Sequence, residues 1–120
     1  MRLNPATMQA LAEECDFFLT MGVSDANPTT ILESMAWGFP VACTPQSGYD
    51  GLSEITTLSI TDMQHNLDTL DRLQGAPDAE LLDQADLARK RVESCYTFER
   101  MTGTVVSTLE RLLAARRETP

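Results

Sequence analysis

Hydrophobic residues in the first twenty positions change from helical to strand-like spacing. Met8 and Leu11 recur at helical spacing behind Pro5, which a first helical turn tolerates, and they predict a short amphipathic helix over residues 4–14. The apolar run that follows is short and aromatic, which favours a buried strand over a second helix. We therefore expect a first strand from Asp16 to Met21.

Residues 28–37 carry a second helical pattern with agreeing signals at both ends. Ile31, Leu32, Met35 and Ala36 lie on one helical face. Asn27 stands where a helix cap is expected, Pro28 suits the first turn and Gly38 suits the stop. These signals predict a helix from Pro28 to Trp37.

The remaining segments predict two more strands and a helical second half. Residues 41–43 form a short apolar run behind Pro40, and residues 56–60 are a threonine-rich, edge-like strand candidate. Beyond residue 61, three apolar stripes at helical spacing predict long helices, the first two separated at residues 75–77. The stripes are Met63, Leu67 and Leu70; Leu81, Ala85, Ala88 and Val92; and Phe98, Met101, Val105, Leu109 and Leu112.

This order of elements predicts an α/β fold. We expect a partial Rossmann-like, three-layer unit with a small parallel sheet of about three strands and long C-terminal helices. No internal repeat or linker divides the chain, so residues 1–120 are expected to form one domain, with an ordered part ending near Arg117. In so small a sheet, the strand from Asp16 to Met21 is an edge whose free backbone groups favour a covering partner.

Charge restricts the possible partners. Nine Lys and Arg against eighteen Asp and Glu give a net charge of −9, which opposes binding to nucleic acid or to an anionic bilayer. No apolar run approaches the roughly 20 residues of a membrane span. The cysteines Cys15, Cys43 and Cys95 form no metal-binding or redox spacing, so we expect buried thiols in the reducing cytoplasm and no metal site.

The segment from Asp25 to Val41 resembles the donor-site signature of retaining glycosyltransferases with the two-domain GT-B fold. Those enzymes carry an E-x7-E motif and a helix of the form LEAMAxGxPVV. Residues 32–36 are LESMA, residues 38–41 are GFPV, and Asp25 stands eight positions before Glu33 in place of the first glutamate. Residues 15–19 and 96–100 are similar to two further family segments. The resemblance implies the C-terminal, nucleotide-sugar-binding half-domain of such an enzyme.

A sugar nucleotide presents both a diphosphate and several hydroxyl groups. The free N–H groups and dipole at the start of a helix attract phosphate, which makes the segment Asn27, Pro28, Thr29 and Thr30 the candidate anion site. Glu33 lies roughly 8 Å farther along the helix and suits a bidentate acceptor for hydroxyl groups. By resemblance, Glu33 holds the donor ribose and Asp25 faces the transferred sugar or its leaving phosphate.

Several alternatives stay open. An acidic residue before a helix is often only a cap, as Asp25 could be, and Glu33 could be a solvated helix residue. The loop over residues 47–51 occupies the place of a family donor loop but is equally consistent with a plain turn. The chain also lacks any Lys or Arg between Arg2 and Arg72, so the family's basic phosphate clamp is absent from this stretch.

The resemblance therefore predicts a donor-binding segment for UDP- or GDP-sugars that is inactive or nearly so on its own, with no cofactor. The competing prediction is a non-catalytic interaction module. In that case the strand from Asp16 to Met21 pairs with a partner chain or with a second copy of this chain.

Overall fold

The computed structural model describes residues 4–24 and 28–118 and has an α/β fold with a small parallel sheet and long C-terminal helices. In chain order the elements are α1 (Pro5–Glu14), β1 (Phe18–Thr20), α2 (Thr29–Ala36), β2 (Val41–Cys43), the 3-10 helix η1 (Pro45–Ser47), β3 (Ile55–Thr57), α3 (Met63–Gly75), α4 (Asp78–Cys95) and α5 (Phe98–Glu118). The predicted fold class is confirmed.

The three strands run parallel in the order β1-β2-β3. Phe18 lies opposite Val41 in the register, and Val41 lies opposite Ile55. The backbone N–H of Phe18 also donates to the carbonyl of Pro40 at 2.9 Å, which extends the β1–β2 ladder by one bond. Helix α2 is thus the crossover between two adjacent parallel strands, as the sequence predicts.

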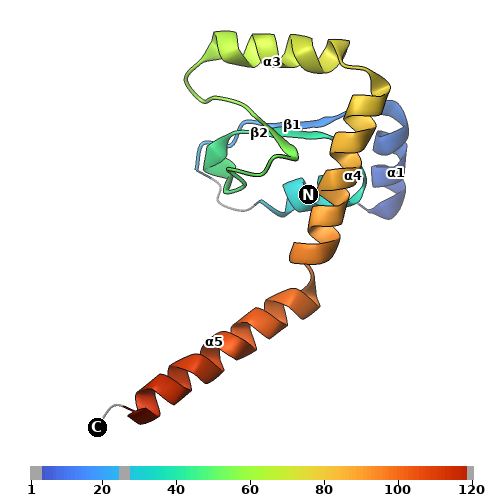
Figure 1. Ribbon diagram of the computed structural model, residues 1–120. Helices are drawn as coiled ribbons and strands as arrows, with labels where there is room; N and C mark the ends of the chain where they lie inside the picture. Colours follow the sequence, from blue (N-terminus) through green and yellow to red (C-terminus); the bar gives the residue numbers. More distant parts are fainter. Residues whose placement is uncertain (1–3, 25–27, 119–120) are drawn as a thin grey trace.

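Helices cover both faces of the sheet and make three layers (Figure 1). On one face, Val41 and Cys43 of β2 pack in a cluster with Ile31 and Met35 of α2 and Ala88 of α4. On the other face, Ala42 packs with Leu58 and with Leu73 of α3. The alternation of β2 side chains between two apolar clusters explains why all three residues of this strand are buried.

The strand boundaries differ from the predicted ones. The first strand is shorter than Asp16 to Met21, and the third begins one residue earlier than predicted and ends at Thr57 instead of residue 60. The third strand ends early because its partner β2 ends at Cys43, whose carbonyl accepts the N–H of Leu58 as the last bond between them. The buried Asn66 side chain of α3 then accepts from the N–H of Ser59 and donates to the carbonyl of Ser59, both at 2.7 Å, and so fixes the chain where it leaves the sheet.

The predicted burial of all three cysteines is wrong. Cys43 is buried in β2, whereas Cys15 and Cys95 are exposed. Cys15 follows the last residue of α1 and Cys95 is the last residue of α4, and both helix ends lie at the surface. Only the strand cysteine lies between the two helical layers.

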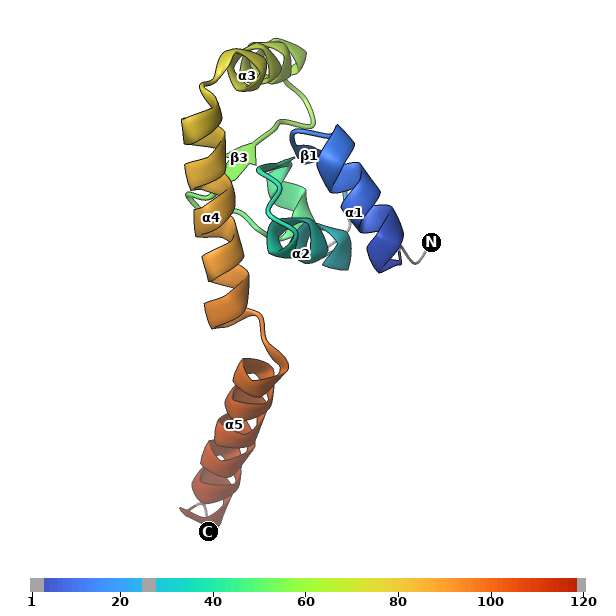
Figure 2. The same ribbon diagram turned by 90° about the vertical axis from the view of Figure 1, so that its right-hand side faces the viewer.

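Helix α5 projects away from the sheet and its covering helices (Figure 2). None of its described residues is buried, although its apolar stripe has the predicted spacing. None of the helices in the described part of the chain has a stretch long and apolar enough to cross a lipid bilayer.

Candidate functional site

The start of α2 and the carboxyl ends of β1 and β2 meet at one rim of the sheet. The hydroxyl of Thr44, directly after β2, donates to the carbonyl of Gly22, two residues after β1. The hydroxyl of Tyr49 donates to the carbonyl of Pro28, the residue before α2, at 3.4 Å. In open α/β sheets, ligands bind at this carboxyl end. We name Gly22, Pro28, Thr44, Ser47 and Tyr49 the rim cluster.

The loop after β2 brings the polar groups of the rim cluster together. Residues 45–47 form a single 3-10 turn, and Gly48 follows with a φ of 85°, a left-handed conformation that glycine adopts without strain. The hydroxyl groups of Thr44 and Ser47 lie 3.3 Å apart, and both side chains are buried. Tyr49 is also buried, with its ring in an edge contact with Tyr96. The rim is therefore a packed and fixed structure.

Part of the predicted anion site lies at this rim. Pro28 precedes the first helical residue, and Thr29 and Thr30 open α2 with exposed side chains. The N–H of Ile31 already donates to the carbonyl of Pro28 at 3.2 Å. Thr29 and Thr30 are thus the residues of the first turn that can present N–H groups to an anion. Asn27 lies outside the described residues.

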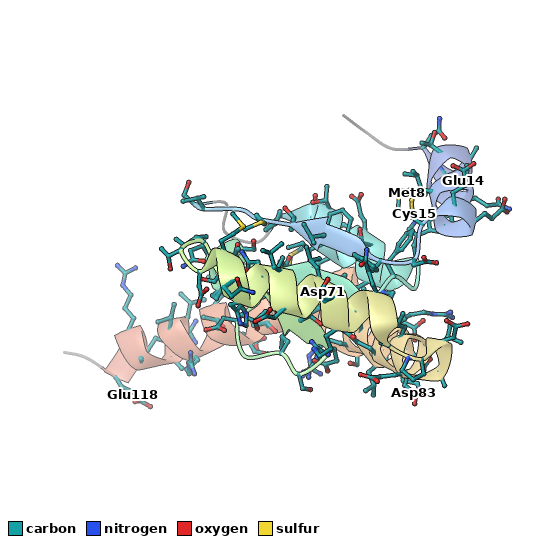
Figure 3. The ribbon with its side chains drawn as sticks, turned by 90° about the horizontal axis from the view of Figure 1, so that it is seen from above. Met8, Glu14, Cys15, Asp71, Asp83 and Glu118 are labelled. Atoms are coloured by element: carbon teal, nitrogen blue, oxygen red, sulfur yellow. The ribbon has the colours of Figure 1, made fainter. Side chains whose placement is uncertain are left out.

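Glu33 is exposed on α2, one turn beyond Thr30. It lines a cavity of about 160 Å³ between α1, β1 and α2, and Thr30 and Ser34 lie on the same wall. The remaining lining is mainly apolar: Met8, Leu11, Cys15, Phe17, Phe18 and Phe39. Figure 3 shows Met8 and Cys15 on the side of α1 that faces the sheet. A cavity of this size and lining does not hold a nucleotide sugar, so a donor would contact Glu33 from the solvent side.

The predicted pairing of Asp25 with Glu33 stays a prediction, because Asp25 lies outside the described residues. Glu33 itself, Thr29 and Thr30 lie within two turns of one helix. The structure therefore places three of the four predicted helix-start residues and one of the two predicted carboxylates in one short stretch of the chain.

Charge at the rim differs from that of an ordinary phosphate site. The sequence has no Lys or Arg between Arg2 and Arg72, so no basic side chain belongs to the rim cluster or to α2. An anion there would be held by backbone N–H groups, hydroxyl groups and the helix dipole. Burial raises the pKa of the Cys43 thiol beneath the rim, which disfavours a thiolate nucleophile at this position.

Sequence reasoning missed the roles of Thr44 and Tyr49 in the rim cluster. Their partners lie 22 and 21 residues away along the chain. The glycine-rich loop over residues 47–51 was the available signal. Among the described residues, no group of three or more His, Cys, Asp or Glu side chains could hold a metal ion. Comparison of the chain with protein-family models, curated proteins and solved structures finds no match.

Proposed function

We propose that this chain is the nucleotide-sugar-binding part of a retaining glycosyltransferase, acting in the cytoplasm on a UDP- or GDP-sugar. The observation that supports the proposal is the position of the family-like segment. Its LESMA part lies in α2, its Gly38 makes a turn with a φ of 85°, and its last residue, Val41, opens β2. The start of α2 lies at the carboxyl-end rim, where α/β proteins bind nucleotides.

In this proposal, each part of the donor meets a group of matching chemistry. The N–H groups of Thr29 and Thr30 hold the diphosphate at the positive end of α2. The Glu33 carboxylate accepts hydrogen bonds from the two ribose hydroxyls, and Asp25 faces the transferred sugar. Glycosyl transfer then depends on electrostatic stabilisation of the leaving diphosphate. Basic groups for that step must come from outside this chain, so the chain alone binds donor without transferring sugar.

Titration calorimetry with UDP- and GDP-sugars tests the proposal. We expect Glu33→Gln to weaken binding by about 10–100-fold, because hydrogen bonds to a charged acceptor contribute about 1.5–3 kcal/mol. Asp25→Asn is expected to weaken binding of the intact nucleotide sugar more than binding of the free nucleotide. Glu13→Gln, an equal change of charge at an exposed position of α1, is the control and should bind like the parent. A folded parent chain that binds no donor would contradict the proposal.

A second candidate function is supported by the two edges of the sheet. At the outer edge of β3, a ring nitrogen of His65 lies 3.0 Å from the carbonyl of Thr57. The His65 side chain thus occupies a group that another strand would need. In the described part of the chain, β1 pairs with β2 alone.

The register of β1 shows which groups are offered to a partner. Phe18 bonds toward β2, so the N–H and C=O of Leu19 point away from the sheet, because successive residues of a strand alternate. Leu19 and Met21 are 38% and 44% exposed. We propose as the alternative function that this edge takes up a strand of a partner polypeptide and acts as a non-catalytic interaction module.

Leu19→Pro tests the alternative, since proline removes an N–H that no strand among the described residues uses. Co-purification of the parent with a partner should be lost in Leu19→Pro and kept in Leu19→Ala, with unchanged far-ultraviolet circular dichroism in both. Equal retention of the partner by Leu19→Pro would contradict edge pairing.

A further inference from the structure

Helix α5 carries a row of large apolar side chains that nothing in the described part of the chain covers. Their exposed fractions run from 46% to 80%. They are Phe98, Met101, Val105, Val106, Leu109, Leu112 and Leu113. The helix has 21 residues and is therefore about 31 Å long. So long an uncovered stripe marks a protein interface.

Five of these seven side chains are spaced symmetrically about Val105 along the helix. Phe98 and Leu112 each lie seven positions from Val105, and Met101 and Leu109 each lie four positions from it. At about 100° per residue, all five fall within about 40° of one line along the helix. We name these five residues the α5 seam. In a symmetric antiparallel dimer, a two-fold axis next to Val105 therefore sets each position of the α5 seam in one copy against a seam position in the other copy.

Within its own length, the α5 seam contains no charged side chain. Glu99, Arg100, Glu110 and Arg111 lie about 120° or more around the helix from its centre line. Arg116 lies about 20° from that line, but it comes four residues after Leu112 and so beyond the end of the α5 seam. The residues that flank the seam more closely are threonines, small or apolar residues. Two seams can therefore meet without burying a charge between them.

The distribution of charge over the whole chain selects the orientation. Helix α5 has four Arg and three Glu, a net charge of +1, so the rest of the chain carries −9 − (+1) = −10. Two such acidic bodies repel each other when they lie side by side. An antiparallel pair of helices sets the bodies at opposite ends of a seam about 21 Å long, well beyond the Debye length of about 8 Å. A parallel pair would also bring Arg116 and Arg117 of the two copies together.

We propose that a second copy of this chain covers α5, through an antiparallel, two-fold pairing of the α5 seams centred on Val105. Phe98 of one copy then meets Leu112 of the other, Met101 meets Leu109, and Val105 meets its own equivalent. The contact strip is about 21 Å long and about 10 Å wide, or about 210 Å² on each copy, which is well below the roughly 1,200 Å² in total of a stable interface. We therefore expect a weak, reversible dimer with micromolar dissociation. This pairing does not depend on the proposed function.

Sedimentation equilibrium across a range of protein concentrations tests whether the dimer exists. The parent should show twice the chain mass at high micromolar concentration, and Val105→Glu should remain monomeric at every concentration. Because Val105 is half exposed in the single chain, Val105→Glu should keep the parent's urea unfolding curve. The control is Arg111→Glu, which places an acidic side chain about 120° around α5 from the centre of the seam. This variant should dimerise like the parent. A monomeric parent, or a dimer that persists in Val105→Glu, would overturn the proposal.

Disulfide cross-linking tests the orientation. In a background with the exposed thiols removed by Cys15→Ser and Cys95→Ser, Val105→Cys should cross-link to itself. Phe98→Cys should not cross-link to itself, but should cross-link to Leu112→Cys when the two variants are mixed. Self-cross-linking of Phe98→Cys would show a parallel pair and overturn the antiparallel arrangement.

Discussion

Replacing Met35 by alanine is expected to lower the free energy of unfolding by about 2–5 kcal/mol. Met35 is completely buried, and its cluster joins α2 and α4 to one face of β2. Deletion of its side chain removes apolar contact and leaves a cavity that the neighbouring side chains fill only in part. Since small domains are stable by about 5–15 kcal/mol, this loss is a large share of the total.

Urea unfolding followed by circular dichroism measures this loss. Met63→Ala is the matched control, because Met63 opens α3 with 69% of its surface exposed. The control should change the free energy of unfolding by no more than about 0.5 kcal/mol. Equal effects of the two substitutions would show that the α2–α4 cluster is not the main core of the fold.

The second large effect is expected at the ion pair between Arg91 of α4 and Glu54, the residue before β3. The Arg91 Nε donates to Glu54 Oε1 at 2.8 Å, and the Glu54 side chain is only 8% exposed. Arg91→Leu leaves this buried carboxylate without its charged partner, a loss of about 1–3 kcal/mol for an unpaired buried acceptor. Arg89→Leu breaks the exposed pair with Glu93 and should cost no more than about 0.5 kcal/mol.

The effect of Arg91→Leu should depend on pH in a defined direction. Burial alone raises the pKa of Glu54, but its own backbone N–H, the Arg91 side chain and Ser53 together hold that pKa below its ordinary value. A lowered folded-state pKa gives stability that is present above the unfolded pKa of about 4.3 and is lost as pH falls through the folded pKa. The difference between parent and Arg91→Leu should therefore shrink when urea unfolding is repeated below about pH 4. A constant difference would contradict the ion-pair account.

The part of the fold that follows from local signals was predictable. Helix α2 agrees with its prediction to within one residue at each end, because Pro28, the apolar face and Gly38 all act within a few residues. The end of β3 was not predictable in this way. It depends on where the distant partner strand β2 ends, and on the buried side chain of Asn66, which binds the backbone of Ser59 beyond that point.

In the candidate site, too, local features could be predicted from the sequence and contacts between distant segments could not. Thr29, Thr30 and Glu33 could be assigned to one helix from spacing alone. The contact of Tyr49 with Pro28 could not, because it depends on how the loop after β2 folds over the start of α2. The apolar stripe of α5 was also predicted, but its spacing did not show that the helix projects from the sheet with none of its described residues buried (Figure 2).

The most direct test of the proposed function is a nuclear magnetic resonance titration of the labelled chain with UDP- and GDP-sugars. We predict saturable shifts of the backbone amide signals, largest at Thr29 and Thr30 and extending to the rim cluster. Signals of the exposed residues of α3 should stay unchanged. Absence of any saturable shift, or shifts confined to residues away from the start of α2, would contradict the assignment of this rim as a nucleotide-sugar site.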